Sequence, residues 1–308
     1  MAYVSVRQEL SADNPYFSFA QYTKLRFGTA AGKCSIDTGF GCVHQRTRGG
    51  CSYCNIASFT PAYVAPTLSV DEQWTRGTAP GHYPRYYAYF QLGTNTGPDA
   101  PISRFIEPLL QKNNIAGIMI GTRPDCLDDA TLHYLSVRGR DIELWLEMGM
   151  QSANNRILDG VNRGHTFEDF ARMAHRIDHA GNILLSAHVV FGLPGETETE
   201  MLSGVEALSH LPVSGVKFHH LAVTEGTKLA EQYRISPFPL FDETSYASIV
   251  ARALALLPPP VVVARLMGDS HEKYLIAPRW KKEKQGVLAM IRAACAEQGL
   301  WQGKQYRV

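Results

Sequence analysis

The sequence predicts an α/β protein built around a parallel sheet, because from about residue 33 onward short apolar segments alternate with amphipathic helical segments. One of these segments, Ile183–Phe191, is mostly apolar, which is typical of a strand buried on both faces. Six or seven such units suit a complete or partial TIM-like barrel and suit a doubly wound sheet equally well. The alternation therefore leaves both architectures open.

Each element is expected from its own apolar pattern. The strands are expected at Lys33–Thr38, Tyr86–Gln91, Gly117–Ile120, Ile142–Met148, Ile183–Phe191, Gly215–His220 and Val261–Arg265. The helices are expected at Ile102–Lys112, Asp128–Ser136, Ala153–Leu158, Thr166–Ala180, Glu198–Leu211 and Thr244–Leu256. The aromatic segment 10–30 is expected to form a cap before the first strand, and the tail 281–308 to contain one helix, Gly286–Gln298.

The composition argues against several classes of protein. Hydrophobic residues make up 45% of the chain, which allows a sizeable core, and the formal net charge of +1 does not indicate a polyanionic partner. Six cysteines in 308 residues do not resemble a secreted disulfide scaffold. The N-terminal residues lack the pattern of a signal peptide, and no apolar stretch approaches the roughly 20 residues of a membrane span. We therefore expect a cytoplasmic protein without a membrane partner, in which metal-bound cysteines are favoured over oxidised ones.

Three cysteines form the most informative motif. Cys42, Cys51 and Cys54 have the spacing C-x8-C-x2-C and follow the first expected strand at its carboxyl end, where α/β folds place their chemistry. Four thiolates would close a structural zinc site or a fully ligated cluster, whereas three leave one metal corner open. From the residues alone the alternatives are an iron–sulfur cluster, a zinc site completed by His44, and unrelated cysteines. The remaining cysteines lack cluster spacing and are expected in the core: Cys34, Cys126 and Cys295.

Small and aromatic residues near the ends of the expected strands are candidates for ligand contact. Gly93 and Thr94 follow the second strand, and Gly192 and Gly195 follow the fifth, where glycine would let the backbone approach a ligand closely. Both segments are equally compatible with ordinary strand-to-helix turns. Tyr53, directly before the last cysteine of the motif, suits either plain packing or stacking against an adenine.

Ionisable side chains on or near the strands are the other candidates. Glu147 has apolar neighbours, so we expect it to be paired or functional. Arg163 suits a bidentate contact with a carboxylate and also an exposed helix end. His188 lies inside an apolar strand, where a histidine is usually satisfied by a neighbour. Lys217 and His219 share one face of the sixth strand, and two polar side chains on one face of an interior strand suit a functional role.

Taken together, these segments resemble a radical S-adenosylmethionine enzyme, in particular the YhcC-like family, a relative of the Elongator catalytic subunit and of the MiaB methylthiotransferases. The resemblance runs over nearly the whole chain. Its motifs are Gly41-Cys42, Arg48–Phe59, Tyr87–Gln91, Gly121–Cys126, Trp145–Ser152, Asn162–His165, Gly192–Glu196, Arg265–Asp269 and Ile276–Trp280. The wider superfamily commonly uses C-x3-C-x2-C, and relatives of this family share a lengthened first gap like the eight residues found here.

The resemblance implies a fold and a cluster. The fold is a partial TIM-like (β/α)6 barrel over residues 33–265, with a short N-terminal cap over 1–32 and a C-terminal helical extension over 266–308 that packs on the barrel. The cysteine motif would hold a [4Fe–4S] cluster with Cys42, rather than Cys34, as its first ligand. S-adenosyl-L-methionine would chelate the fourth iron through its amino and carboxylate groups.

The resemblance also implies the residues that bind this cosubstrate. They are Tyr53, Gly93, Thr94, Gln151, Arg163, His188, Gly192 and Gly195. Gly93 and Thr94 stand where related enzymes contact the methionine amino group, and Arg163 stands opposite the carboxylate. His188 matches a polar position near the ribose, and the turn from Gly192 to Gly195 would lie against the adenine.

The implied activity is a radical reaction. An external one-electron donor such as flavodoxin or ferredoxin reduces the cluster, S-adenosylmethionine is cleaved to methionine and a 5′-deoxyadenosyl radical, and the radical abstracts hydrogen from a substrate. The catalytic residues are expected at the barrel mouth: Glu147, Lys217 and His219. The substrate stays open between transfer RNA, a small metabolite and a peptide, and the net charge does not favour nucleic acid. The alternative is a non-catalytic iron–sulfur or zinc sensor or binding protein on the same α/β scaffold.

Overall fold

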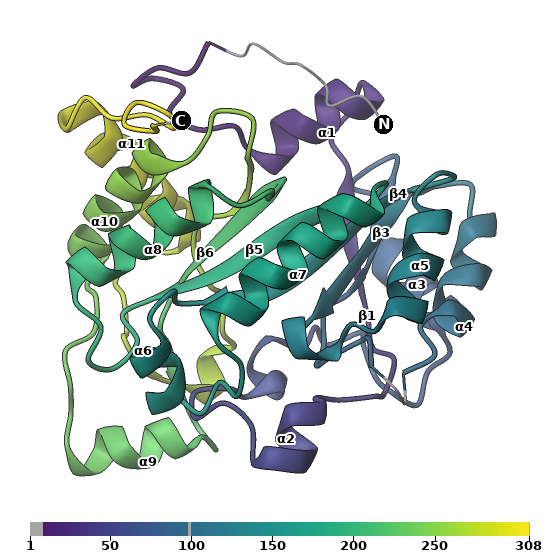
Figure 1. Cartoon of the computed structure of the whole chain (residues 1–308), viewed down its shortest axis with the longest axis horizontal. Helices are drawn as coiled ribbons and strands as arrows, with labels where there is room; N and C mark the ends of the chain where they lie inside the picture. The colour runs from purple at the N-terminus through teal and green to yellow at the C-terminus, as the bar shows by residue number, and fades with distance from the viewer. Residues whose placement is uncertain (1–8, 98–99, 308) are drawn as a thin grey trace.

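The protein folds around one seven-stranded parallel sheet that curls into a half-barrel (Figure 1). The computed structural model describes residues 9–97 and 100–307. The strands are β1 (Gly32–Ile36), β2 (Tyr86–Phe90), β3 (Ile115–Thr122), β4 (Glu143–Gln151), β5 (Leu184–Phe191), β6 (Gly215–His220) and β8 (Val262–Arg265). Their order in the sheet follows the order of the chain, and every neighbouring pair is parallel. The predicted partial barrel is therefore confirmed, with all seven expected strands in place.

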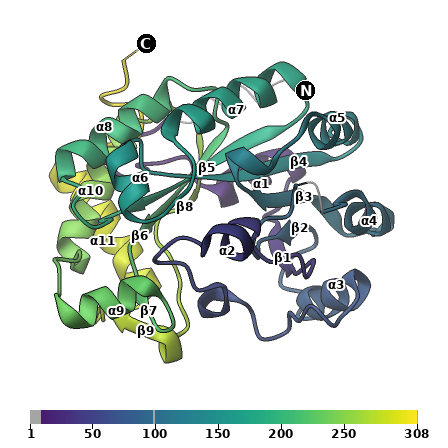
Figure 2. The same ribbon diagram turned by 60° about the horizontal axis from the view of Figure 1, so that its bottom comes forward.

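Helices connect the strands and cover the outer face of the sheet, as Figure 2 shows for α3, α4, α5, α7, α8 and α10. The helices are α1 (Phe19–Phe27), α2 (Val43–Arg48), α3 (Val70–Thr78), α4 (Ser103–Ile106), α5 (Asp129–Arg138), α6 (Asn155–Gly160), α7 (Phe167–Ala180), α8 (Glu198–Ser209), α9 (Lys228–Ile235), α10 (Glu243–Leu256) and α11 (Lys284–Glu297). Short 3-10 helices lie at Ile56–Phe59, Glu107–Gln111, Pro124–Cys126 and Glu272–Tyr274. A separate two-stranded antiparallel sheet joins β7 (Val223–Thr224) to β9 (Leu275–Ala277). None of the helices described is long and apolar enough to cross a membrane.

Helix α7 shows how local sequence produces these elements. Thr166 and Asp169 form a reciprocal capping box at its start, which satisfies backbone N–H groups that the first turn leaves free. Phe170, Met173 and Ile177 recur at helical spacing and are buried against the sheet. The same pattern of a capped start and an apolar stripe makes this helix predictable from the sequence.

The structure adds elements that the apolar pattern does not predict. Helix α1 lies within the expected cap, α2 lies inside the cysteine motif, and α3 connects β1 to β2. Helix α2 has only six residues, too few to show an apolar period, and it ends at Gly49 in the left-handed conformation. The core positions of Cys34, Cys126 and Cys295 are confirmed, since all three are buried.

The N-terminal segment closes the end of the half-barrel where the strands begin. The ring of Phe19 in α1 lies 5.3 Å from that of Tyr87 and 6.4 Å from that of Trp145, measured between ring centroids. Arg26 in the same helix forms an ion pair with the buried carboxylate of Glu143 at 3.2 Å. Because α1 fills this end, access to the interior is left to the opposite end, where α2 lies (Figure 1). At the other end of the chain α11 packs against α10, and the boundaries at residues 32/33 and 265/266 stay a prediction.

Candidate active site

A cavity of about 270 Å³ opens among the carboxyl ends of the strands. All three cysteines of the motif line it, together with residues from β2, β3, β4, β5, β6 and β8. Parallel α/β folds place ligands at this end because the strand ends and following loops converge there. Nine further predicted site residues line the cavity with the cysteines: Tyr53, Gly93, Thr94, Glu147, Gln151, Arg163, His188, Lys217 and His219.

The loop that carries the cysteines is anchored on both sides. Cys42 precedes α2, and this short helix occupies the lengthened gap before Cys51. The side-chain amide of Asn162 donates hydrogen bonds to the carbonyl oxygens of Arg48 (3.0 Å) and Gly50 (2.7 Å). The backbone N–H of Cys54 donates to the carbonyl of Cys51 at 3.1 Å, which forms a tight turn between them. These bonds fix the loop without using a cysteine side chain.

Two of the cysteine sulfurs have polar partners in the cavity. Arg163 Nη1 lies 3.4 Å from Cys51 Sγ, and Thr94 Oγ1 lies 3.5 Å from Cys42 Sγ. Cysteine binds metal as the thiolate, and the guanidinium group places a positive charge beside that ligand atom. Soft thiolates suit iron–sulfur clusters, so the donor set fits a cluster held by three cysteines.

The same residues are poorly placed to bind a single metal ion such as zinc. In the described part of the chain, no three His, Cys, Asp or Glu side chains gather closely enough to ligate one metal ion. His44, the candidate fourth zinc ligand, uses its Nε2 in a 2.6 Å hydrogen bond with the carbonyl of Asn162. Its imidazole therefore serves to hold the loop, and it does not line the cavity.

Gly93 brings the end of β2 into backbone contact with the cysteine loop. Its φ of +74° lies in the left-handed region, and a Cβ at this position would overlap the backbone of Gly41. The next residue, Thr94, donates its backbone N–H to the carbonyl of Gly41 at 2.8 Å. Both the left-handed backbone and the lack of space for a side chain require glycine at position 93.

Arg163 is held rigidly beside the end of β4. Its Nη2 donates to the carbonyl of Gly149 at 2.9 Å, and its Nε donates to His165 Nε2 at 2.7 Å. Burial and the neighbouring guanidinium lower the pKa of His165 to about 4, so its ring is neutral and accepts this bond. Gln151 has a φ of +69°, and its buried Oε1 has no hydrogen-bond partner in the described structure. An unpaired buried amide oxygen in a cavity indicates a ligand that donates to it.

Deeper in the half-barrel, Glu147 forms an ion pair with Lys217, and both side chains are buried. Lys217 Nζ also donates to Tyr89 Oη at 2.9 Å, and Lys33 Nζ lies 3.8 Å from the Glu147 carboxylate. Burial by itself would raise the pKa of Glu147, but the ammonium groups of Lys217 and Lys33 outweigh it and hold the pKa at about 2. Sequence analysis gave no role to Lys33, or to Tyr89 within the motif Tyr87–Gln91, because only the curl of the sheet brings these side chains to Glu147.

Two histidines face the same region. The rings of His188 on β5 and His219 on β6 pack edge to face with their centroids 4.0 Å apart. Neither ring's buried Nε2 has a hydrogen-bond partner in the described structure. Burial and the positive charge of Lys217 lower the pKa of His188 to about 3, so this ring is neutral.

The glycines after β5 lie outside the cavity lining. Gly192 has a φ of +87°, and its Cα faces the ring of Phe241. The carbonyl of Gly195 accepts a hydrogen bond from Arg156 Nη2 at 3.1 Å. Their contact with an adenine stays a prediction, whereas Arg265 at the end of β8 lines the cavity although sequence analysis assigned it no role.

Comparison with known proteins identifies this arrangement. The model of the radical SAM superfamily matches residues 38–207, and that of the radical SAM C-terminal domain matches residues 213–297. The chain is 31% identical to MJ0486 of Methanocaldococcus jannaschii over 94% of this chain and 93% of that protein. It is 30% identical to YhcC of Escherichia coli over 83% of this chain and 84% of that protein.

The fold agrees with these matches. The solved structure of Elp3 from Methanocaldococcus infernus with an N-terminal deletion superposes with a TM-score of 0.66 at 18% identity, over 88% of this chain and 63% of that one. The chain belongs to the radical SAM superfamily and, within it, to the YhcC-like family. It is accordingly an enzyme whose cofactors are a [4Fe–4S] cluster and S-adenosylmethionine. A non-catalytic sensor or zinc protein is not favoured.

Proposed function

We propose that the enzyme uses Cys42, Cys51 and Cys54 to hold the cluster and abstracts a hydrogen atom from a substrate bound deeper in the half-barrel. When bound, the cluster and S-adenosylmethionine together supply one-electron cleavage of the cosubstrate to methionine and a 5′-deoxyadenosyl radical that takes the hydrogen atom. The observation that carries the proposal is the convergence of the three cysteines and the strand-end polar residues on one cavity.

The chain's own residues orient the cosubstrate. Arg163 presents a fixed guanidinium that suits the cosubstrate carboxylate, and the unpaired Oε1 of Gln151 suits its amino group. The backbone around Gly93 and Thr94 lies against the cysteine loop, where it suits contact with the same end of the molecule. His188 suits the ribose, and Tyr53 suits the adenine as an aromatic face in the cavity wall.

The substrate is proposed to meet Glu147, Lys217 and His219 on the inner wall. The Glu147–Lys217 pair is fixed by burial, so it supplies oriented charge rather than a mobile base. The reducing electron comes from an external donor of the flavodoxin or ferredoxin type. None of the six cysteines, all of which lie in the described residues, forms a disulfide bond, which suits a reducing compartment such as the cytoplasm.

The proposal is tested with protein reconstituted anaerobically with iron and sulfide. We expect about four irons per chain, and release of 5′-deoxyadenosine from S-adenosylmethionine when dithionite is added. Cys42→Ala, Cys51→Ala and Cys54→Ala should each lose most of the iron and the cleavage. Cys34→Ala is the matched control, because this buried cysteine lies on β1 close to the motif and outside the cavity.

Arg163→Met separates cosubstrate binding from cluster binding. We expect at least a tenfold loss in affinity for S-adenosylmethionine by equilibrium titration, since a charged fork is removed from its proposed carboxylate. Iron-loaded wild-type protein that releases no 5′-deoxyadenosine would contradict the proposal, as would retention of full iron content in all three cysteine variants.

A further inference from the structure

Arg265 differs from the other arginines that line the cavity. Arg123 donates two hydrogen bonds of 2.9 Å to Asp125, and Arg163 is held by Gly149 and His165. The side chain of Arg265, at the end of β8, makes no hydrogen bond within the described residues, and its one ion pair, with Asp269, is 3.9 Å long. Its guanidinium group is therefore free to bind something else in the cavity.

The one carboxylate near Arg265 is engaged elsewhere. Asp269 lies 3.9 Å from Arg265 Nη1, but it accepts a hydrogen bond from Lys284 Nζ at 2.6 Å. The Arg265 side chain is only 26% exposed, so water does not fully solvate its charge. A half-buried guanidinium with one long ionic contact is costly unless a ligand completes its partners.

The wall around Arg265 carries more positive than negative charge. Lys33 and Lys217 share the carboxylate of Glu147, and Arg265 and Lys284 share that of Asp269, so four basic groups face two carboxylates. Burial lowers the pKa of Lys33 and Lys217, and the charge of Glu147 opposes this shift. The same positive field contributes to the lowered pKa of His188, after burial itself. An anionic group bound here would offset this excess of charge.

Two hydrogen-bonding atoms in the same wall also lack partners. The Nε2 atoms of His188 and His219 are buried without hydrogen bonds in the described structure. A neutral imidazole offers one N–H donor and one acceptor nitrogen. With His188 assigned to the cosubstrate ribose, His219 is left to contact an oxygen atom of a further ligand. Both residues and Arg265 line the same cavity.

We propose that the inner wall binds the anionic end of a small-molecule substrate, with Arg265 contacting a carboxylate or phosphate group and His219 contacting a neighbouring polar atom. This inference rests on the proposed function, because the group would occupy the cavity in which hydrogen is abstracted. A small molecule is favoured over RNA because the free cation lies inside the half-barrel, whereas RNA presents its phosphates on an extended outer backbone.

The test is binding of defined anions to the reconstituted protein in the presence of S-adenosylmethionine. Inorganic phosphate, succinate and citrate are titrated at constant ionic strength with chloride as the balancing anion, and binding is read by calorimetry and by the rise in melting temperature. We expect saturable binding of at least one of them, weakened at least tenfold in Arg265→Gln. Arg265→Lys, which keeps the charge and loses the fork, should fall between the two.

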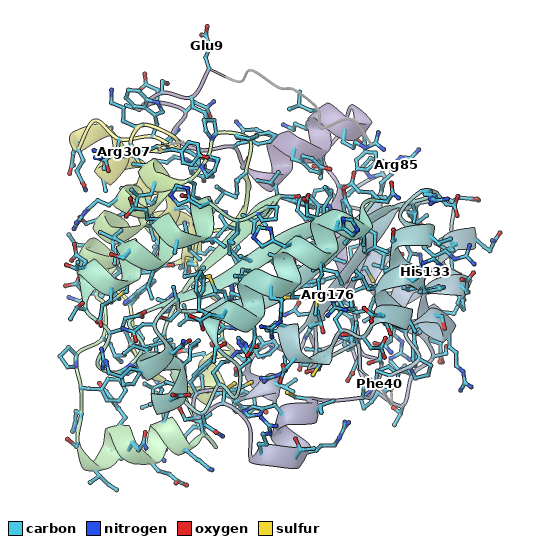
Figure 3. The ribbon with its side chains drawn as sticks, viewed as in Figure 1. Glu9, Phe40, Arg85, His133, Arg176 and Arg307 are labelled. Carbon is cyan, nitrogen blue, oxygen red and sulfur yellow. The ribbon has the colours of Figure 1, made fainter. Side chains whose placement is uncertain are left out.

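Arg85→Gln is the matched control. Arg85 is exposed and lies at the end of the half-barrel opposite Phe40 and the cysteine loop (Figure 3). The Arg85→Gln variant should bind the anions as tightly as the wild type does. His219→Gln gives a second, uncharged probe of the site and should weaken binding if the imidazole contacts the ligand. If only phosphate binding depends on Arg265, the site takes a phosphate group. If only succinate or citrate binding depends on it, the site takes a carboxylate.

The results separate this inference from the function that it rests on. Cleavage of S-adenosylmethionine by the wild type, without binding of any probe, overturns the anion site and leaves the proposed function standing. Arg265-dependent binding of an anion, without cleavage of S-adenosylmethionine, supports the anion site and overturns the proposed function. Binding of bulk transfer RNA that is lost in Arg265→Gln, with no response to small anions, overturns the inference in favour of an RNA substrate.

Discussion

The carboxylate of Glu147 on β4 and the ammonium group of Lys217 on β6 form a buried ion pair inside the half-barrel. The two strands flank β5, so the pair links strands that are not hydrogen-bonded to each other. Tyr89 from β2 and Lys33 from β1 complete the group. This group connects strands β1, β2, β4 and β6 across the interior of the half-barrel and forms part of the inner wall of the cavity.

Glu147→Gln is expected to destabilise the protein by about 3 kcal/mol, because it leaves the buried Lys217 without its counter-charge. The measurement is anaerobic urea unfolding of the reconstituted protein. The pKa of Glu147 is about 2 in the folded protein, against 4.5 for a glutamate in the unfolded chain. The ion pair therefore contributes its full stabilisation above pH 4.5. Its contribution is lost as the pH falls from 4.5 toward 2, and the difference between variant and wild type should shrink accordingly.

The double variant Glu147→Gln with Lys217→Met is the control for this prediction. Removing both charges takes away the uncompensated ammonium group, so stability should return toward the wild type. Equal stability of Glu147→Gln and the wild type at pH 7 would show that the pair is not buried as described.

Gly93→Ala is expected to lower both stability and iron content. A Cβ would overlap the Gly41 backbone, directly before the first cysteine, and the backbone at Gly93 is left-handed. Gly81→Ala is the control, since Gly81 has a φ of +63° but its Cβ would meet nothing within 4 Å. The control should lose about 1 kcal/mol from conformation alone, with iron retained. Equal iron content in the two variants would mean that the close approach of β2 does not hold the cysteine loop.

Glu196 provides a test by pH. Burial raises the pKa of this carboxyl group to about 7, although a hydrogen bond with Ser152 opposes the shift. Between pH 4.5 and 7 the folded state therefore holds a proton that the unfolded state releases, so stability falls as the pH rises through this range. Glu196→Gln should gain about 1–2 kcal/mol over the wild type at pH 8 and little at pH 5.

Urea unfolding at the two pH values measures this difference. Glu206→Gln, at an exposed position on helix α8, which begins two residues after Glu196, serves as the control and should shift stability by a similar small amount at both values. A Glu196→Gln variant whose advantage is the same at pH 5 and pH 8 would contradict the role of burial.

The predictable part of the site consists of residues whose role is local in the chain. Cys51 and Cys54 are separated by two residues, and Gly93 lies in the turn after β2, so spacing and turn chemistry indicate them. His44 illustrates the limit, because its residue type suits zinc, yet its ring bonds to Asn162 from a distant helix end. Arg265 illustrates the converse, because it lies in the motif Arg265–Asp269 but only the tertiary structure places its side chain in the cavity.

The sequence by itself determined the seven strands, six of the helices between them and the three cysteines after the first strand, since apolar periodicity and ligand spacing are properties of short segments. Tertiary structure alone decided which side chains share the cavity. Lys33, Glu147 and Lys217 come from separate strands, and they meet because the sheet curls and buries their charges together. Burial then decides the electrostatics, since only a desolvated carboxylate and ammonium need each other so strongly.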